Sequence, residues 1–223
     1  MSNARRDFEQ GYIELIDQMG DDMAVVNAAR VSFNGASKGE EQNKKLLFYL
    51  MEHKHTSPFE MVQFKWYVKA PLIVIAQWQR HRTWGYNQVS RRYTSNDISF
   101  WYPTEFRSQD AKNKQASFDD LDEYDNRAAA DIVAEVTEFC EASYHELLDL
   151  GVSREIARIV LPQNLHASMI ATVNAHNLLH FIELRYSNEA QKEIRDYAMA
   201  MLEIMEETMP WTVEAFKKYR LKL

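Results

Sequence analysis

Residues 62–69 alternate between apolar and polar side chains, and the alternation stops just before Pro71. Such alternation predicts a β-strand with one buried face. Proline has no backbone N–H to leave unpaired in the first turn of a helix, so Pro71 is well placed to begin one. The apolar residues that follow form a helical stripe, which comprises Leu72, Ile73, Ile75, Ala76 and Trp78. This segment therefore predicts a strand that passes directly into a helix, with Gln77 and Arg80 at the end of that helix.

The middle of the chain carries a second strand pattern and a long helix pattern. A strand is predicted over 98–102, and a polar loop follows to about residue 116. Residues 118–150 predict a long helix that ends at Gly151. One face of this helix is apolar, Cys140 belongs with it, and we expect it to be buried. That face comprises Ile132, Val136, Phe139, Tyr144 and Leu147.

Two further helices are predicted towards the C-terminus. Ser153 is a good N-cap for a helix over 154–161, which stops at Pro162. The last long helix is predicted over 188–208. Strands mixed with long helices, without regular βαβ alternation, favour an α+β fold with a central, mostly antiparallel sheet flanked by long helices.

The composition is that of an ordinary globular protein. The 223 residues carry a formal charge of -7 and are 46% hydrophobic, which predicts a single domain over 1–223 and argues against non-specific nucleic-acid binding. The longest apolar run, 72–76, is too short to span a bilayer, and the first residues lack a signal-peptide pattern. We therefore expect a cytoplasmic protein with no membrane partner. The single cysteine, Cys140, excludes an intrachain disulfide framework, and its mid-helix apolar position argues against a nucleophile.

Residues 77–93 concentrate four arginines, a histidine and four aromatic residues in this acidic chain. Arginine binds phosphate through its planar fork of donors and stacks on flat rings. The segment therefore predicts a site for a phosphorylated aromatic ligand such as a nucleotide or dinucleotide; the alternative is a solvated basic loop. We interpret the hydroxyl of Ser90 as a phosphate ligand. No Gly-x-Gly-x-x-Gly or Gly-Lys-Ser/Thr loop is present, so arginine has to bind the phosphates.

A histidine-bearing helix is predicted after the apolar, partly β-branched run over 169–173, because Asn174 can cap it. His176, His180 and Glu183 fall at i, i+4 and i+7, which places them on one helical face. Such a face suits a metal ion, but without a glutamate between the histidines the motif is weak. A metal-dependent hydrolase of a phosphorylated substrate is therefore one alternative, and histidines that bond a cap or a cofactor are another.

Arg158 and Arg185 are isolated cations in mostly apolar helical segments. Each has to reach water, pair with an acid or bind a ligand. Glu155 and Glu183 are the nearest acidic partners in the sequence, and a glutamate three residues before an arginine is a common helix pair. The spacing alone leaves both interpretations open.

Several motifs resemble those of the flavin-dependent thymidylate synthases. Arg80-His81-Arg82, followed by seven residues and Ser90, is similar to the signature of that family. Three further stretches match in the family's order: His55-x-Ser57-Pro58-Phe59-Glu60, then Arg154-Glu155-x-Ala157-Arg158-x-x-Leu161-Pro162, then Asn174-Ala175-x-x-Leu178 with Leu184-Arg185. The resemblance implies a homotetramer that binds FAD, with active sites at subunit interfaces. It also implies that dUMP is methylated to dTMP, with 5,10-methylenetetrahydrofolate as carbon donor and NADPH as reductant, and that reduced flavin rather than a cysteine takes part.

The same resemblance implies roles for individual residues. Arg185 would be catalytic, because a cation placed against the pyrimidine stabilises negative charge on it. The residues that would bind the cofactor are Ser57, Arg80, His81, Arg82, Gln88, Asn174, His176 and His180. The residues that would bind the nucleotide are Gln77, Arg80, Gln88, Ser90, Arg92, Arg158 and Arg185. No metal ligand is implied.

The sequence departs from the family pattern at three positions. Gln88 stands where glutamate is usual, Gly85 where serine is common and His176 where arginine is frequent. Glutamine still accepts a hydrogen bond but carries no charge, so Gln88 is expected to alter nucleotide affinity or turnover. The altered motif also leaves open another pyrimidine deoxynucleotide as substrate, or a hydroxymethyl product. A nucleic-acid module is a further alternative, and the net acidity of the chain argues against it.

Overall fold

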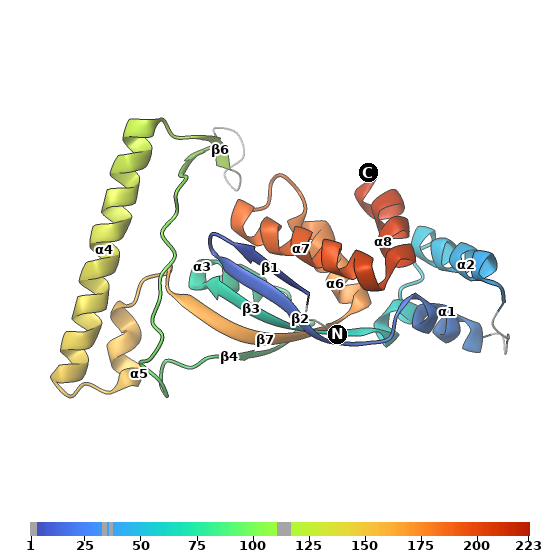
Figure 1. Cartoon of the computed structure of the whole chain (residues 1–223), viewed down its shortest axis with the longest axis horizontal. Coiled ribbons are helices and arrows are strands. Elements are labelled where there is room, and N and C mark those ends of the chain that lie inside the picture. The colour runs from blue at the N-terminus through green and yellow to red at the C-terminus, as the bar shows by residue number, and fades with distance from the viewer. Residues whose placement is uncertain (1–3, 33–34, 36–37, 111–116) are drawn as a thin grey trace.

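The computed structural model describes residues 4–32, 35, 38–110 and 117–223 of the chain (Figure 1). Its centre is a five-stranded sheet in the order β1-β2-β3-β7-β4, in which every neighbouring pair is antiparallel. These strands are β1 Arg5–Phe8, β2 Gly11–Met19, β3 Gln63–Pro71, β4 Gly85–Gln88 and β7 His166–Asn174. The structure thus confirms an α+β fold with a mostly antiparallel sheet.

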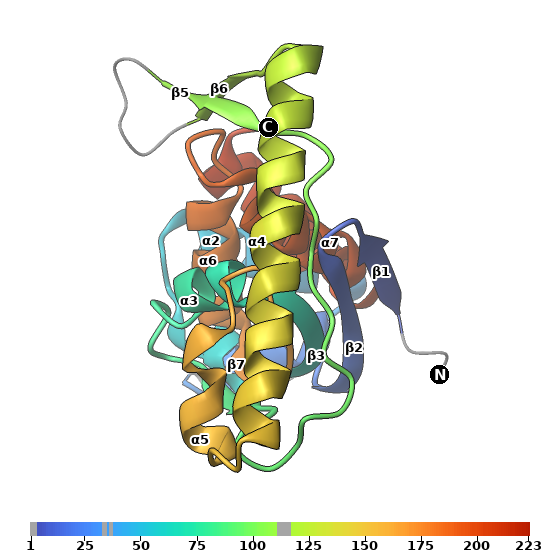
Figure 2. The ribbon, with the colours of Figure 1, turned by 90° about the vertical axis from the view of Figure 1, so that its left-hand side faces the viewer.

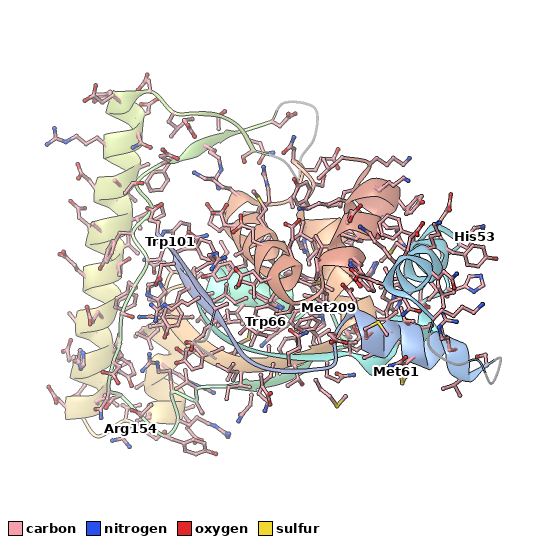
Figure 3. The ribbon with its side chains drawn as sticks, turned by 45° about the vertical axis from the view of Figure 1, so that its right-hand side comes forward. His53, Met61, Trp66, Trp101, Arg154 and Met209 are labelled. Carbon is pink, nitrogen blue, oxygen red and sulfur yellow. The ribbon has the colours of Figure 1, made fainter. Side chains whose placement is uncertain are left out.

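Helices pack on one face of this sheet (Figure 1). They include α3 Leu72–Trp78, α6 Ala175–Arg185, α7 Lys192–Thr208 and α8 Pro210–Phe216, which the π-helical turn η3 Lys217–Leu221 follows. The side chains of Phe64, Trp66 and Val68 on β3 are buried beneath them, and Trp66 lies at the centre of the molecule (Figure 3). The alternation of residues 62–69 is therefore confirmed as a strand with one buried face.

Both central strands pass directly into helices. β3 ends at Pro71 and α3 follows, whereas β7 ends at Asn174, whose side chain accepts a hydrogen bond from Asn177 N at 2.9 Å and caps α6. In the antiparallel register Pro71 pairs with His166, so the two helices start at opposite ends of the same ladder. A nine-residue strand extends about 30 Å, and the seven and eleven residues of α3 and α6 together extend about 27 Å. The C-terminal ends of the two helices therefore meet over the sheet.

The sequence patterns predict no element before residue 62, yet the described residues of this part form strands and helices. It forms β1 and β2, then α1 Asp22–Val31, α2 Glu40–Glu52 and the 3-10 helix η1 Ser57–Met61. Asp22 is buried and ties α1 to α8: its carboxylate accepts hydrogen bonds from Trp211 N at 2.8 Å, Thr212 N at 3.0 Å and the Thr212 hydroxyl at 2.6 Å. A carboxylate at this point caps the N-terminus of α8.

A helical arm stands at one side of the sheet (Figures 1 and 2). It comprises α4 Glu123–Asp149, α5 Arg154–Ala157 and the 3-10 turn η2 Arg158–Val160, with the small hairpin β5 Arg107–Gln109 and β6 Ser117–Asp120 beside α4.

Two predictions for this region were wrong. Residues 98–102 make only an isolated bridge from Phe100 to Leu165, because Pro103 and the turn residues before it prevent a longer ladder. The long helix begins at Glu123 rather than 118, because 117–120 pair in the hairpin and Asp122 is the cap.

The remaining boundaries differ less. α5 is a single turn that continues as 3-10 rather than one helix over 154–161, and Ser153 makes no side-chain cap bond. The last long helix starts at Lys192 rather than 188. Of the polar loop predicted to about residue 116, positions 111–116 lie outside the described residues, and Arg107–Gln109 form β5.

The apolar face of α4 is only partly buried. Tyr144 faces inward as expected and is fully buried, but the side chains of Ile132, Val136 and Phe139 are exposed. Cys140 is half-buried rather than buried. The apolar face expected on this helix is therefore present, but within the described chain it is fully buried only at Tyr144, and Ile132, Val136 and Phe139 form an apolar row on the surface.

Candidate active site

The C-terminal ends of α3 and α6 bring Gln77, His81 and Arg185 together. Nε of Arg185 donates a hydrogen bond to Nε2 of His81 at 3.1 Å, and its Nη2 donates to the backbone oxygen of Gln77 at 3.4 Å. Arg185 forms no ion pair with any described carboxylate; the nearby Glu183 pairs with Arg220 at 2.6 Å. Burial lowers the pKa of the Arg185 guanidinium, so an anion bound beside it would relieve an unfavourable charge.

The basic turn that follows α3 is held by an aromatic support. The hydroxyl of Tyr86 donates to the backbone oxygens of Trp78 at 3.0 Å and His81 at 2.9 Å, which closes the turn between α3 and β4. Beneath it, Phe181 stacks on Trp78 with ring centroids 5.0 Å apart and meets the His81 ring edge-on at 4.8 Å. The prediction that the basic motif lies at a helix end and in the turn beyond it is confirmed; β4 over Gly85–Gln88 was not anticipated.

This turn presents Arg80 and Arg82 to solvent. Both side chains are exposed, and neither takes part in an ion pair within the described ranges. Two unpaired guanidinium groups next to a third, Arg185, create a positive surface in a protein of net negative charge. Such a surface favours a phosphorylated ligand.

His81 is held neutral in this cationic setting. Burial, and then the charge of Arg185, lower its pKa from 6.5 to about 4. A neutral imidazole that accepts at Nε2 carries its proton on Nδ1, so the hydrogen bond from Arg185 fixes the tautomer. The imidazole therefore orients the guanidinium without adding charge to the site.

We expect the His81 imidazole to titrate near pH 4, and its pKa to rise towards 6.5 in Arg185→Ala, because that change removes a neighbouring charge and opens the site. Since the folded pKa lies below the unfolded one, the stability contributed by neutral His81 is complete above pH 6.5 and is lost as the pH falls towards 4. NMR titration of the histidine ring signals measures both. Arg185→Lys, which keeps the charge, serves as control, and an identical titration in Arg185→Ala would contradict the coupling.

The residues after the basic turn lie along β4 and the loop that follows it. Gln88, on β4, accepts a hydrogen bond from Gln79 Nε2 at 3.2 Å and lines an open cavity of about 480 Å³ on the sheet. The Ser90 hydroxyl accepts from the backbone N–H of Arg92 at 3.3 Å. The Arg92 guanidinium is exposed and lies 5.2 Å from the ring centroid of Tyr93. Ser90 and Arg92 are thus adjacent, as a phosphate-binding pair requires.

The histidines of α6 lie at a different place, beside α2 and η1. His176 and His180 line a small cavity together with His55, Thr56 and Glu183. Burial lowers the pKa of His176. Ser57 is exposed at the start of η1, directly after Thr56. Asn174 uses its side-chain oxygen to cap α6, so its role in the fold is the N-cap.

The predicted metal face receives no support from the geometry. Over the described parts of the chain, no three His, Cys, Asp or Glu side chains lie close enough to hold a metal ion. The Glu183 carboxylate bonds through both oxygens to Arg220, at 3.2 and 2.6 Å. Glu183 is therefore already held by an arginine.

Arg158 lies apart from the other predicted site residues. It starts η2 in the helical arm, next to Arg154, which lies at the far side of the molecule from His53 (Figure 3). Its Nε donates to the backbone oxygen of Glu155 at 3.2 Å, not to the carboxylate considered above, and its side chain is exposed. The simple helix ion pair was therefore the wrong interpretation for both isolated arginines.

Three residues that support the site were missed in the sequence. Gln79 bonds Gln88, Gln191 accepts a hydrogen bond from the side chain of Gln77, and Tyr86 holds the basic turn. Gln79 and Tyr86 lie inside the basic segment, but nothing in their spacing distinguishes them. Gln191 comes from the start of α7, and only the tertiary fold brings it to α3.

Comparison with known proteins identifies the class and then the family. Residues 14–211 match the family model described as Thymidylate synthase complementing protein. A flavin-dependent thymidylate synthase of Thermus thermophilus is 46% identical over 214 residues, which cover 96% of this chain and 78% of the relative. One from Thermosipho africanus is 43% identical, covering 96% and 94%. The protein is thus an enzyme of the methyltransferase class. It belongs to the flavin-dependent thymidylate synthase family.

A solved structure supports the fold. The chain superimposes on a UMP/dUMP methylase from Streptomyces cacaoi, bound with 5-Br dUMP, with a TM-score of 0.85 and 33% identity, covering 93% of this chain and 95% of the other. The same methylase bound with 5-Br UMP also gives 0.85, at 32% identity. None of the described helices is long and apolar enough to cross a membrane.

Proposed function

We propose that this enzyme catalyses the FAD-dependent reductive methylation of dUMP to dTMP, with 5,10-methylenetetrahydrofolate as carbon donor and NADPH as reductant. The observation that carries the proposal is the convergence of α3 and α6, which sets Arg185, with no carboxylate partner among the described residues, against Gln77 and His81. The family membership supports the same reaction.

In this proposal Arg185 faces the pyrimidine ring. Its guanidinium stabilises negative charge on N3 and the carbonyl oxygen O2 of the pyrimidine as carbon 5 becomes nucleophilic, and removal of one such donor typically costs about 10²- to 10³-fold in rate. Neutral His81 holds the guanidinium in place. The residues that bind phosphate and sugar are Gln77, Arg80, Gln88, Ser90, Arg92 and Arg158.

The side chains present suit an anionic dinucleotide cofactor. Arg80 and Arg82 are exposed cations that form no ion pair in the described part of the chain, and His176 and His180 line a cavity beside Ser57. FAD would be held by these five residues with His81, Gln88 and Asn174, and when reduced it supplies the hydride of the methylation. The protein's own contribution is to bind, orient and neutralise charge.

The position of Arg158 supports an active site shared between copies of the chain. Arg158 begins η2, which follows α5 in the helical arm, whereas Arg185 ends α6, and Figure 1 shows α5 and α6 in different parts of the molecule. The same arm exposes an apolar row of Ile132, Val136 and Phe139, whose side chains are 62%, 52% and 73% exposed. Exposed apolar surface of this kind marks a protein interface. We infer that the arm packs against other copies in a homotetramer and delivers Arg158 to their sites.

Phe139→Arg should break this assembly. A charge in the middle of an apolar interface has to be desolvated without a partner, which costs several kcal/mol, so we expect dimers or monomers in place of tetramers. Analytical ultracentrifugation measures the change. Glu138→Arg, which places the same side chain at the next, exposed polar position of α4, about 100° around the helix from Phe139, is the control. A Phe139→Arg variant that sediments like the unmodified protein would contradict the interface.

Gln88→Glu should change nucleotide affinity or turnover. Glutamate keeps the acceptor that receives the hydrogen bond from Gln79 but replaces the amide donor by charge, which alters the hydrogen bond offered to a ribose hydroxyl. We expect a change of about tenfold in the Kd or kcat, the size of one altered hydrogen bond to a charged group. Calorimetry with dUMP and steady-state kinetics measure it, and Gln79→Leu tests whether the orientation of Gln88 matters. Unchanged constants in Gln88→Glu would remove any special role for this residue.

A second candidate substrate is UMP. The methylase from Streptomyces cacaoi is described as acting on UMP and dUMP, and Gln88 replaces a charged residue beside the expected sugar site. A neutral amide can donate to or accept from an extra ribose hydroxyl. Parallel assays with UMP and dUMP, with the product identified by mass, separate these substrates and reveal a methyl or hydroxymethyl product.

The first test of the proposed function is the visible spectrum of the protein after FAD is added and the excess is removed by gel filtration. We expect a retained oxidised-flavin spectrum that dUMP perturbs, and dTMP formation once NADPH and the folate are supplied. A protein that retains no flavin and forms no product would overturn the proposal. Bound metal with phosphate-ester hydrolysis would instead favour the hydrolase alternative built on His176, His180 and Glu183.

A further inference from the structure

A second cavity, of about 240 Å³, lies between the first turn of α7, the turn joining β1 to β2, and the segment that leads to β5. None of its lining residues belongs to the sets expected to bind nucleotide or flavin. Trp101 forms part of its wall and lies between α4 and the sheet (Figure 3). The cavity is therefore separate from the proposed active site.

Carboxylates dominate the charged groups of this cavity. It is lined by Glu9, Glu105, Glu193 and Asp196, against two cations, Arg107 and Lys192. The cations are engaged: Arg107 pairs with Glu193 at 2.7 Å and Lys192 with Glu105 at 2.9 Å. Glu9 and Asp196 form no salt bridge with a described cation, and the four carboxylates outnumber the two cations of the lining, so the cavity attracts positive charge.

Two buried polar atoms of the wall have no hydrogen-bond partner. Glu193 is 4% exposed; its Oε1 accepts from Arg107, while its Oε2 has none among the described residues. Trp101 is 9% exposed, and its Nε1 also lacks a partner over those residues. A buried polar atom left unpaired costs about 1–3 kcal/mol, so native proteins rarely leave a carboxylate oxygen in this state. A ligand with N–H donors would satisfy the Glu193 oxygen once that side chain turns it towards the cavity, whereas the Trp101 N–H is itself a donor and would need an acceptor.

The acidic wall is fixed in place by Gln10, which is 3% exposed. Its side-chain nitrogen donates to Asp196 Oδ2 at 3.1 Å and to the backbone oxygen of Glu193 at 3.0 Å, and its own backbone oxygen accepts from Tyr197 at 3.3 Å. Burial raises the pKa of Asp196, and the hydrogen bond from Gln10 and the charges of Lys192 and Arg195 offset this only in part, so a further cation beside the carboxylate would be favourable. These contacts form a preorganised site.

We propose that this cavity binds a small organic cation that carries a primary ammonium group. An ammonium ion offers three donors to carboxylate oxygens such as those of Glu193 and Asp196. The rings of Phe8 and Trp101 in the wall suit an organic cation, whose alkyl groups and charge both favour aromatic faces. A metal ion fits less well, because no three acidic or histidine side chains of the described chain are placed to hold one.

The test uses four compounds that share a four-carbon chain: diaminobutane, aminobutanol, butanediol and succinate. Calorimetry with the full-length protein should show one site per chain for the two amines, with diaminobutane the tighter, and no binding of the neutral diol or the dianion. Diaminobutane should also raise the Tm of the unmodified protein. Flavin and nucleotide are absent from this titration, so its result does not depend on the proposed reaction.

Two variants locate the binding. Glu193→Gln and Asp196→Asn should each weaken diaminobutane binding by at least about tenfold, because each removes a buried charge next to the cation. Glu206→Gln is the matched control, since it neutralises an exposed carboxylate on the same helix that pairs with Lys217. If Glu193→Gln is unstable, Asp196→Asn still gives a result. Equal binding by all three variants, equal binding of the diol, or no amine binding to the unmodified protein would overturn the proposal.

Discussion

Replacement of Arg185 by alanine should reduce dTMP formation by about 10²- to 10³-fold, the effect typical of a lost donor to developing negative charge. The fold and flavin binding should be preserved, because Arg185 ends α6 and contributes two hydrogen bonds, to His81 and Gln77, but no ion pair with the described carboxylates. Turnover at saturating dUMP, together with the rate at which the folate and nucleotide oxidise the reduced flavin, measures the loss.

Two variants make this result specific. Arg185→Lys keeps the positive charge but loses the planar fork, so it should recover only part of the rate. Arg6→Ala removes an arginine whose partners are the exposed Glu203 and Glu207, and it should leave turnover unchanged. Full activity in Arg185→Ala would exclude the catalytic role, whatever the behaviour of the other two.

Phe181→Ala should have the largest effect on stability, about 3–5 kcal/mol, which is the usual cost of deleting a buried aromatic ring. Phe181 is fully buried, and its ring contacts those of Trp78 at 5.0 Å, Trp84 at 5.2 Å and His81 at 4.8 Å. The cavity left behind lies directly beneath the basic turn. We therefore expect the free energy of unfolding in urea to fall, and the His81 signal to change even where the variant is still folded.

Phe181→Leu is the control, because it refills most of the volume and should cost less than half as much. Tyr124→Ala removes a ring that is 82% exposed and should change stability by less than about 0.5 kcal/mol. A loss in Phe181→Ala no greater than that in Tyr124→Ala would show that the aromatic support does not hold the turn.

Much of the fold near the site follows from local sequence patterns. The alternation of residues 62–69 and the proline after it predict β3 and α3, and Asn174 predicts the start of α6. These signals are strong because side-chain periodicity and caps act over a few residues. The strand expected over 98–102 was wrong: Pro103 and the turn residues before it leave only the bridge from Phe100 to Leu165. A local pattern does not show how long a ladder the tertiary fold allows.

The inward face of α4 shows another limit of local patterns. Ile132, Val136 and Phe139 are spaced to form an apolar stripe, and the stripe is real, but it faces solvent in the single chain. Periodicity shows that a helix has an apolar face and says nothing of whether the same chain or another copy covers it. The homotetramer therefore stays a proposal that the Phe139→Arg experiment decides.

The residues of the basic segment, their family resemblance and the strand-to-helix junctions were determined by the sequence alone, because they depend on residue identity and short spacings. The meeting of Arg185 with His81 and Gln77, 104 and 108 residues away, was decided only by the tertiary structure. It requires the antiparallel register of β3 and β7, because this register starts α3 and α6 at opposite ends of the ladder. The summed length of the two helices nearly equals the length of the paired strands, so the helix ends meet. Burial of that meeting point then lowers the pKa of His81, an effect that no spacing in the sequence can report.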